Sequence, residues 1–538
     1  MVNEFTFAAR DGTKIGVMVY APEGHGRFPA LLAASPYRYD NNALPAGPQF
    51  LWRETGPIEF YVKHGYAYVH MDVRGSGKSG GAFEFLGPKE QTDLYDAVQW
   101  IAKQSWSNGK VGGVGQSYFC MSQWWLGIQA PPALACLAAY DGLNDPYRAS
   151  CYNGGIAGQF FPGYWWNQNR IINRHPANGA APREQEVDLD AMMAAHPTYD
   201  EFWRVRCAWE RLPEIKVPLY SIGIWGKVDL HTRGNIEGFR LASGPKKLQM
   251  RGPPNAWAAN AEFNGIELHE KVLRPFYDRY LKDVATDYEQ RPPVEYFVRG
   301  ANLFRTANAW PPEDVKYVAW HLHGASSGSV TSLNDGSLQS AQGEGSTSYA
   351  YPNPGWVTGV VGFGPQGPPH FDPPRRVLTF TSAPLEQDLE IAGPIKLVLY
   401  AASTGTDTDF FVKLAEQYPQ AAEERAKGVN PASQLVTKGW LRASHRALDA
   451  RRSSEMEPYH THAAPEPLRP GEVTRFQISL EPNAYRFKRG SRIRLEIANG
   501  DSAVTDMLWT HYYAPTKIGQ DTIWHSAKYP SALVLPVA

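Results

Sequence analysis

The fold is decided by the stretch Lys110-Val-Gly-Gly-Val-Gly-Gln-Ser117-Tyr-Phe-Cys-Met-Ser-Gln-Trp-Trp-Leu126. It reads as a short buried strand, a sharp turn at Ser117 and then a helix. A tight strand-to-helix corner leaves no room for side chains, and Gly112, Gly113 and Gly115 meet that need. The first N–H groups of such a helix suit an anion forming on a substrate carbonyl. The stretch predicts a nucleophile elbow, although a strand end with a helix cap is the alternative.

Composition bounds the organisation and the partners of the chain. At 538 residues it is too long for one compact core, so two or three domains are expected. Lys and Arg number 53 against 54 Asp and Glu, a net charge of -1 that gives no reason to expect nucleic acid. No basic segment followed by an apolar stretch opens the chain, and no window approaches a membrane span. We therefore expect a soluble, cytoplasmic protein that does not bind membranes, and a homo-oligomer is compatible with this.

The cysteines have no paired spacing: they are Cys120, Cys136, Cys151 and Cys207. This pattern fits buried reduced thiols better than a disulfide framework or a metal site. Cys120 lies one helical turn beyond Ser117, where it is either a second nucleophile or a packing residue, and packing is the favoured interpretation.

Changes in periodicity divide the chain. Short apolar runs alternate with helical segments over residues 1–145 and again over 213–310, which predicts one α/β domain with a mostly parallel sheet. Residues 146–212 interrupt the alternation and are predicted to be an inserted helical cap. Residues 311–538 show period-two runs between turn-rich loops, which predicts an antiparallel β-sandwich. The clearest predicted elements are strands at 28–34, 66–71, 110–115 and 217–225, and helices at 90–104 and 267–282.

Several motifs, in order along nearly the whole chain, resemble those of a known family. They are Ser35-Pro-Tyr37-Arg, Met71-Asp-Val-Arg-Gly-Ser-Gly-Lys-Ser-Gly, Gln104-Ser-Trp-Ser-Asn-Gly-Lys-Val-Gly, Gly115-Gln-Ser117-Tyr118, Asp229 with Gly234 five residues later, Asp407-Thr-Asp-Phe-Phe-Val, Gly439-Trp-Leu-Arg-Ala-Ser-His-Arg and Tyr529-Pro-Ser-Ala-Leu-Val-Leu-Pro. The set resembles the α/β-hydrolases of the X-Pro dipeptidyl-peptidase and cocaine esterase type, known as CocE/NonD hydrolases. The resemblance implies an α/β-hydrolase core with an inserted helical cap and a C-terminal jelly-roll β-sandwich domain.

The resemblance also implies roles for particular residues. The family's turn has the form G-x-S-Y-x-G, so Ser117 is the expected nucleophile, and Cys120 stands where the second glycine would be. The expected oxyanion hole combines the Tyr118 N–H with the Tyr37 hydroxyl. Asp229 is the expected triad carboxylate, following the nucleophile in chain order. No metal or organic cofactor is implied.

The histidine of a triad is missing from its expected place. A serine hydroxyl is a weak nucleophile until a neighbouring base takes its proton. The family places this histidine shortly after a Gly-Pro motif, but residues 251–260 read Arg-Gly-Pro-Pro-Asn-Ala-Trp-Ala-Ala-Asn. The slot falls on Ala256 or Trp257, and neither side chain accepts a proton.

Three explanations stay open. Another group supplies the base; His231, His269 and Lys227 lie nearest in sequence, and nothing local favours any of them. Alternatively, the chain is an inactivated or engineered variant. As a third explanation, the fold serves a non-hydrolytic, cyclase-like reaction or simple ligand binding.

The favoured interpretation is a serine hydrolase, esterase or acyltransferase acting on a small ester or amide. The chain is rich in tryptophan, with 17 copies. Several of these gathered in a pocket would favour an aromatic or bulky apolar group on the substrate. The candidate substrate-binding residues are Trp165, Trp166, Trp225 and Trp257.

Overall fold

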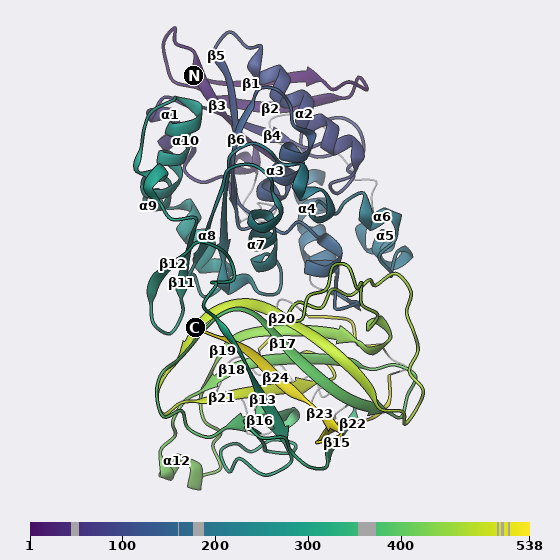
Figure 1. The fold of residues 1–538 in the computed structure, drawn as a ribbon. Coiled ribbons are helices and arrows are strands. Elements are labelled where there is room, and N and C mark those ends of the chain that lie inside the picture. The colour runs from purple at the N-terminus through teal and green to yellow at the C-terminus, as the bar shows by residue number, and fades with distance from the viewer. Residues whose placement is uncertain are drawn as a thin grey trace.

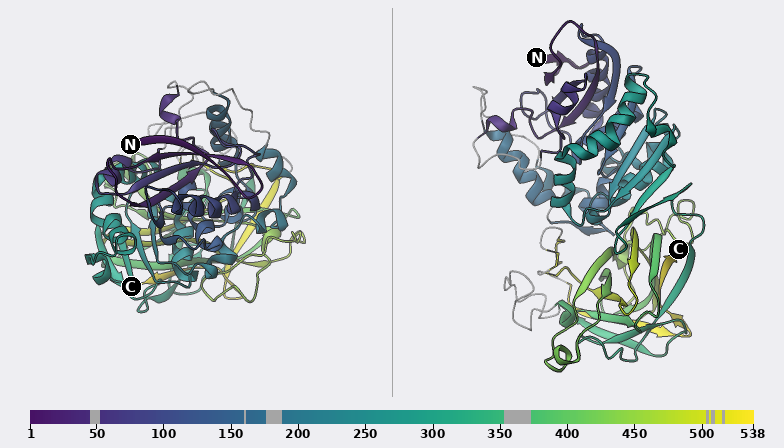
Figure 2. Two further views of the ribbon diagram at one scale, coloured as in Figure 1. Left: turned by 90° about the horizontal axis from the view of Figure 1, so that it is seen from above. Right: turned by 90° about the vertical axis from the view of Figure 1, so that its left-hand side faces the viewer.

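The chain folds into an N-terminal α/β unit stacked on a C-terminal β-rich unit (Figures 1 and 2). The computed structural model describes residues 1–44, 53–159, 161–175, 188–352, 373–502, 505–506, 510–514 and 517–538. Among these residues, no helix combines the length and the apolar character needed to cross a membrane.

The α/β unit is built on one ten-stranded sheet with the order β1-β2-β4-β3-β5-β6-β9-β10-β11-β12. The seven strands from β4 to β11 in this order run parallel, and β1, β2 and β12 add antiparallel edges. The mostly parallel sheet is as predicted. The strands are β1 (Val2–Ala8), β2 (Lys14–Tyr20), β3 (Phe28–Ser35), β4 (Ala67–Asp72), β5 (Ser107–Gly113), β6 (Leu134–Tyr140), β9 (Leu219–Ile224), β10 (Lys246–Arg251), β11 (Val294–Val298) and β12 (Leu303–Ala307).

Helices cover both faces of this sheet. α2, α3 and α7 pack on one face, and α1 and α10 pack on the other. Because both faces are covered, the residues of the central strands β3, β4, β6 and β9 are almost all buried. The helices are α1 (Ile58–Lys63), α2 (Pro88–Ala102), α3 (Tyr118–Gln129), α7 (Thr232–Leu241), α8 (Ala256–Asn264), α9 (Ile266–Leu268) and α10 (Arg274–Leu281).

One predicted helix, residues 267–282, is interrupted. The segment η6 (His269–Leu273) forms a wide π turn between α9 and α10. Pro275 follows this turn, has no N–H to donate, and clashes with the carbonyl four residues earlier in a regular α-helix. The proline therefore accounts for the local widening.

Among its described residues, the interval from 146 to 212 holds short helical segments and no strand of the ten-stranded sheet. These helical segments lie between β6 and β9. The same interval contains two short strands, β7 (Tyr152–Asn153) and β8 (Ile156–Ala157), that pair with each other to form a small separate ribbon. The helical segments are η2 (Tyr147–Cys151), η3 (Phe161–Trp165), α4 (Trp166–Arg174), α5 (Leu189–Ala195), α6 (Glu201–Arg204) and η4 (Trp209–Glu214).

The C-terminal unit is a single sheet that curls toward closure. Its path runs β15-β22-β17-β20-β19-β18-β21-β16-β14-β13-β24, and β24 also pairs with β17, which gives the sheet a barrel-like form. The jelly-roll connection stays a prediction. The strands are β13 (Lys316–His323), β14 (Gly336–Gln339), β15 (Ser346–Tyr351), β16 (Leu378–Ser382), β17 (Leu389–Ser403), β18 (Asp409–Gln417), β19 (Ser433–Arg442), β20 (Thr474–Phe487), β21 (Arg492–Ala498), β22 (Gly519–Ser526), β23 (Tyr529–Pro530) and β24 (Ala532–Val537); the helix α12 (Ala422–Ala426) lies outside the sheet.

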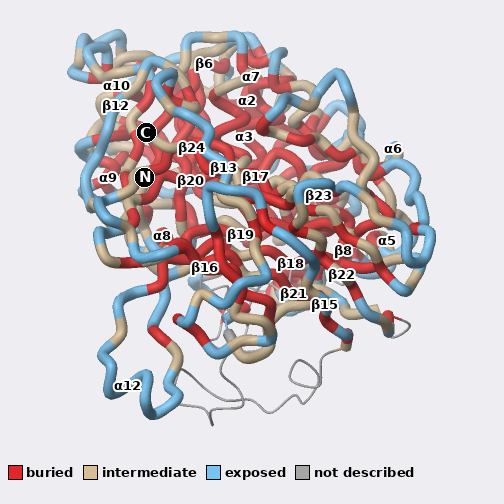
Figure 3. Tube along the Cα trace, turned by 60° about the horizontal axis from the view of Figure 1, so that its bottom comes forward, coloured by how far each residue is buried: buried red, intermediate tan, exposed pale blue. Residues whose placement is uncertain are grey.

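The two units share a buried junction. Trp225 and Ile236 of the α/β unit form one apolar cluster with Ala392 and Ala484 of the C-terminal unit. Figure 3 shows buried chain running through α3, β17 and β20, while α5, α6 and α12 lie at the exposed periphery. The carboxyl ends of the parallel strands, where ligands bind in open α/β sheets, therefore face the C-terminal unit.

Candidate active site

Ser117 lies at the tip of a strained elbow between β5 and α3. Its backbone has φ 60° and ψ -118°, a conformation that L-residues adopt only where surrounding structure enforces it. The Ser117 N–H donates to the Asp141 carbonyl oxygen at 2.9 Å, and the Gln116 N–H donates to the Glu54 carbonyl oxygen at 2.9 Å. A Cβ on Gly115 would lie 2.3 Å from the Phe119 Cβ, so only glycine fits there. The strand, turn and helix are as predicted.

The Tyr37 hydroxyl lies beside this elbow. It accepts a hydrogen bond from the Trp165 Nε1–H at 3.1 Å and lies near enough to the Ser117 hydroxyl for that group to act on the pKa of Tyr37. The Tyr37 ring meets the Tyr118 ring edge-on at 6.2 Å between centroids. The Tyr118 N–H belongs to the first turn of α3, where backbone donors have no partner within the helix. The structure thus brings together Ser117, Tyr37 and the start of α3.

A carboxyl group that sequence reasoning did not single out also lies here. Glu54 is 5% exposed, and the nearby Ser117 and Tyr37 hydroxyls act to lower the pKa of its carboxyl. Burial raises the pKa of Glu54 to about 8, against the opposing effect of the Lys227 ammonium and with the support of the Asp141 charge. The Glu54 backbone has φ 55°, so a second strained residue faces the strained serine.

Behind the elbow, Asp141 gathers three polar side chains. Its carboxylate accepts from the Gln116 Nε2 at 2.7 Å, pairs with the Lys227 Nζ at 2.5 Å and lies 3.2 Å from the His231 Nδ1. Burial works to raise the pKa of Asp141, but the Lys227 ammonium, with His231, holds it well below its usual range. Burial lowers the pKa of His231. Lys227 therefore interacts with two buried carboxyl groups, those of Glu54 and Asp141.

Asp229, the expected triad carboxylate, has other partners. Its Oδ2 accepts from the Lys438 Nζ of β19 at 3.0 Å, and Lys438 also pairs with Asp506 at 2.7 Å. Among the described residues, no hydrogen bond or ion pair joins Asp229 to Ser117 or to a histidine. Its observed contacts link the two units of the chain.

The expected histidine slot contains no substitute base. Ala256 and Trp257 open α8, and the Trp257 side chain is 60% exposed. His269 donates and accepts elsewhere, since its Nδ1 lies 2.7 Å from the Tyr61 hydroxyl and its Nε2 lies 2.6 Å from the Phe263 carbonyl oxygen. His269 is therefore a structural residue of the core.

The remaining tryptophans and Cys120 are placed as follows. Trp165 stacks on Tyr118 with 5.9 Å between ring centroids, and Trp166 stacks on Phe83 at 5.1 Å. Trp225 lies in the junction core, where its Nε1–H donates to a backbone carbonyl. Burial raises the pKa of the Cys120 thiol well above its ordinary value, which fits packing rather than nucleophilic attack. The structure therefore brings Trp165 to the elbow and gives Trp225 other surroundings.

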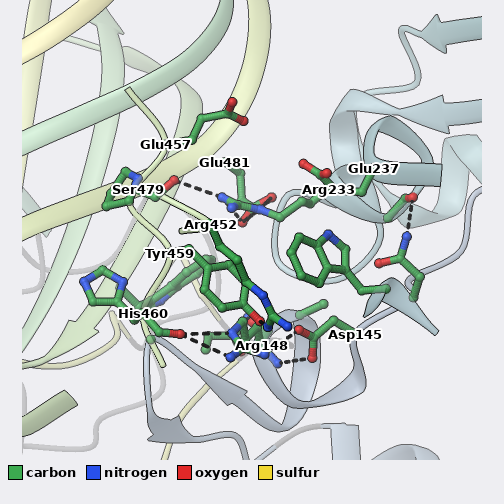
Figure 4. Close-up of a pocket in the computed structure, with 18 of the residues that line it drawn as sticks. Asp145, Arg148, Arg233, Glu237, Arg452, Glu457, Tyr459, His460, Ser479 and Glu481 are labelled. Atoms are coloured by element: carbon green, nitrogen blue, oxygen red, sulfur yellow. Dashed lines mark hydrogen bonds and ion pairs between the residues drawn. The ribbon is translucent and has the colours of Figure 1, made fainter. Parts of the chain in front are cut away.

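A cavity of about 350 Å³ opens beyond the loop that follows Asp141, between α7 and the C-terminal unit (Figure 4). Its charged side chains pair with one another. Arg148 pairs with Asp145 at 2.8 Å, and Arg233 of α7 pairs with Glu481 of β20 at 3.0 Å. Ser117 does not line this cavity, and of these two pairs Arg233–Glu481 links the two units. Among the described residues, no group of three or more His, Cys, Asp or Glu side chains is arranged to hold a metal ion.

The sequence held a signal for Asp141 and none for Glu54. Asp141 directly follows β6, the neighbour of the β5 strand that leads to Ser117, and a carboxylate at such a strand end is a common site residue. Glu54 lies in a loop before α1 and carries no motif. Only tertiary packing brings it to Ser117.

Nearly the whole chain is similar to known proteins. Residues 11–253 match the family model of X-Pro dipeptidyl-peptidases, and residues 286–534 match that of their C-terminal non-catalytic domain. The cocaine esterase of Rhodococcus sp. is 24% identical over 98% of this chain and 97% of its own length. A Mycobacterium bovis protein, provisionally named a serine esterase, is 27% identical over 98% of this chain and 94% of its own. The crystal structure of a Staphylococcus aureus CocE/NonD family hydrolase superposes with a TM-score of 0.82 at 26% identity, covering 99% of this chain and 93% of that one.

Proposed function

Because the chain belongs to the CocE/NonD family of α/β-hydrolases, with the X-Pro dipeptidyl-peptidases and cocaine esterase, we propose that it cleaves or transfers the acyl group of a small ester or amide through Ser117. One observation carries the proposal. Ser117 is held in a strained conformation at the start of α3, with the Tyr37 hydroxyl nearby. A strained turn that projects a hydroxyl toward free N–H groups is built for attack on a carbonyl.

The proposed oxyanion hole consists of the Tyr118 N–H and the Tyr37 hydroxyl. The phenol oxygen of Tyr37 accepts from the Trp165 Nε1–H, and the phenol O–H is the proposed donor to the developing oxyanion. Burial raises the pKa of Tyr37 well above its usual value, so the phenol keeps that proton at neutral pH. Two donors fixed in advance lower the barrier without reorganisation during the reaction.

The proposed substrate carries an aromatic or bulky apolar group. Trp165 contacts Tyr37, Tyr118 and Phe85, with ring centroids 5.9 to 6.4 Å apart, so aromatic surface surrounds the elbow. Trp166 extends this surface toward Phe83. Stacking against such rings favours aromatic acyl or leaving groups.

The test is covalent labelling of Ser117. A fluorophosphonate probe is expected to modify Ser117, mapped by peptide mass spectrometry, and Ser117→Ala is expected to lose both labelling and turnover of p-nitrophenyl esters. Ser122→Ala is the matched control, because Ser122 lies in the same helix and donates to the Ala34 carbonyl oxygen at 2.9 Å. It should retain both activities.

The same assay separates the chemical outcomes. An added alcohol or amine that accepts the acyl group in competition with water identifies acyl transfer, whereas a purely hydrolytic enzyme yields only the free acid. An unlabelled Ser117, together with unchanged turnover in Ser117→Ala, would show that the site performs other chemistry.

A further inference from the structure

We propose that the Glu54 carboxylate takes the proton of the Ser117 hydroxyl, filling the role that a histidine has in a serine triad. The inference rests on the proposed function, in which Ser117 attacks an acyl carbon. It assigns a catalytic residue that lies in a loop before α1. It also gives the elbow and the proposed oxyanion hole a proton acceptor in place of the histidine of a triad.

The packing fixes Glu54 against the elbow. Its carbonyl oxygen accepts from the Gln116 N–H at 2.9 Å, and that same oxygen lies 3.4 Å from where a Cβ on Gly115 would be. The Ser117 and Tyr37 hydroxyls lie near enough to its carboxyl to lower its pKa, in opposition to burial. The Oε2 atom is buried and has no hydrogen-bond partner among the described residues. A buried carboxyl oxygen without a partner costs free energy, and such a cost persists where a group serves a function.

The charged groups around Glu54 come from three elements. Lys227 lies in η5 (Trp225–Lys227) after β9, and Asp141 lies after β6, so one cation and one anion face Glu54 from the sheet. His231 reaches the cluster only through Asp141. Together with burial these groups set the pKa of Glu54 near 8. The carboxylate form needed for proton acceptance is therefore populated as the pH rises through 8, and a base with a pKa near the working pH is efficient.

Among the described residues, no hydrogen bond or ion pair joins Lys227, His231 or His269 to Ser117. The Lys227 ammonium is bound by Asp141 at 2.5 Å, and no described interaction joins His231 to Ser117. Both ring nitrogens of His269 are engaged in the core. Glu54 is the titratable group that neighbours the nucleophile together with the oxyanion-hole tyrosine.

Glu54 carries the proton in both halves of the proposed reaction. The Ser117 Oγ bonds to the acyl carbon as its proton passes to the Glu54 carboxylate, and the oxyanion accepts from Tyr37 and from the Tyr118 N–H. The tetrahedral adduct then collapses, and the departing alkoxide or amine takes the proton from Glu54. Water next attacks the acyl-serine and gives a proton to Glu54, which returns it to the Ser117 Oγ as the acid leaves.

The primary experiment is the pH profile of kcat/KM for a p-nitrophenyl ester. For the native chain, kcat/KM is expected to rise with an apparent pKa near 8. Glu54→Gln, which keeps the shape of the side chain, is expected to lose about a hundredfold or more in kcat and to lose that ionisation. Retention of the native profile by Glu54→Gln would overturn the proposal.

Glu90 provides the matched control. It is a second fully buried carboxyl with its pKa raised to about 8 by burial, but it accepts from the Tyr118 hydroxyl at 2.7 Å and does not neighbour Ser117. Glu90→Gln is therefore expected to keep the ionisation near pH 8. Loss of the ionisation in Glu90→Gln, with its persistence in Glu54→Gln, would assign it to Glu90 and refute the role of Glu54.

Two further variants distinguish a catalytic role of Glu54 from a purely structural one. Formate is expected to restore turnover to Glu54→Ala at least tenfold, and the rescued profile should be flat near pH 8 because formate is ionised throughout. Lys227→Met, which leaves Glu54 intact but removes its neighbouring cation, should move the rising limb to higher pH. A purely structural role for Glu54 predicts neither result.

Fluorophosphonate labelling of the native chain distinguishes the two proposals. If Ser117 is labelled and Glu54→Gln behaves as the native chain, only the role of Glu54 fails. If Ser117 is not labelled in the native chain, the proposed function itself fails.

Discussion

Tyr37 and Ser117 come from different elements, yet each is held by contacts that leave its hydroxyl little freedom. Trp165 donates to the Tyr37 oxygen, and backbone hydrogen bonds to Glu54 and Asp141 fix the two residues of the turn. Such fixation is what an oxyanion hole requires, because donors that are already oriented need no reorganisation. At the scale of single residues, the site is therefore characterised by hydrogen bonds that hold ordinary side chains in fixed positions.

Removal of the Tyr37 hydroxyl tests this arrangement. Tyr37→Phe is expected to lower kcat about 100- to 1000-fold with little change in KM, because the donor acts on the oxyanion and not on the bound ester. Tyr39→Phe is the matched control, since Tyr39 lies two residues away and its buried hydroxyl has no hydrogen-bond partner among the described residues. Equal losses in the two variants would argue against a direct role for Tyr37.

At the scale of elements, the elbow between β5 and α3 stores backbone strain. Ser117 has φ 60°, and the short link between a buried strand and a buried helix leaves it no alternative. The N–H of Ser117 and the Gln116 side chain are both tied to Asp141 after β6, so neighbouring strands enforce the turn. The strain is the consequence of placing a side chain at the tip of so tight a corner.

A pair of substitutions measures that strain. Ser117→Gly is expected to be more stable than Ser117→Ala by about 1 kcal/mol, because glycine adopts this conformation freely and this outweighs its larger entropy in the unfolded chain. Thermal unfolding followed by circular dichroism reports the difference. The sign should reverse at Ser122 inside α3, where Ser122→Gly is expected to be less stable than Ser122→Ala by about 1 kcal/mol. The same sign at both positions would contradict a strained elbow.

At the scale of the whole molecule, buried charges tie the two units together. Asp229 of the α/β unit pairs with Lys438 of the C-terminal unit, and their side chains are only 11% and 6% exposed. Burial raises the pKa of Asp229, against the opposing effect of the Lys438 ammonium. Arg233 and Glu481 add a second, more exposed pair across the same junction. These contacts make Asp229 a residue of the junction, whereas its role as a triad carboxylate stays a prediction.

Removal of Lys438 is expected to loosen that junction. Lys438→Met leaves the Asp229 carboxylate buried without its cation, and the expected cost is about 3 kcal/mol. Calorimetry should show a lower unfolding temperature or separate transitions for the two units. Asp229→Asn in the same chain should recover part of the loss, since no charge is then left unpaired.

The activity of these variants discriminates between two roles of Asp229. If Asp229 acts only at the junction, Asp229→Asn should retain most of the turnover at temperatures where the protein is folded. If Asp229 orients a catalytic base, turnover should fall steeply even in the fully folded protein, whereas Lys438→Met should lose mainly stability.

The sequence by itself determined the alternation of strands and helices, the elbow at Ser117 and the β-rich C-terminal part. These follow from the period of apolar residues and from glycines that only a tight turn needs, and both are local properties of the chain. The break in the helix before Pro275 is equally local and could have been read from the proline. The motif order also led to the correct family, because it spans nearly the full length.

Only the tertiary structure decided what surrounds Ser117, the proposed nucleophile. Glu54 is separated from Ser117 by 63 positions (117 − 54) and from Lys227 by 173 (227 − 54), and no local pattern links them. They meet because the loop before α1 and the ends of β6 and β9 converge at one edge of the parallel sheet. The pKa of Glu54 near 8 likewise arises from burial and neighbouring charges, which are properties of the packed molecule and not of the residue.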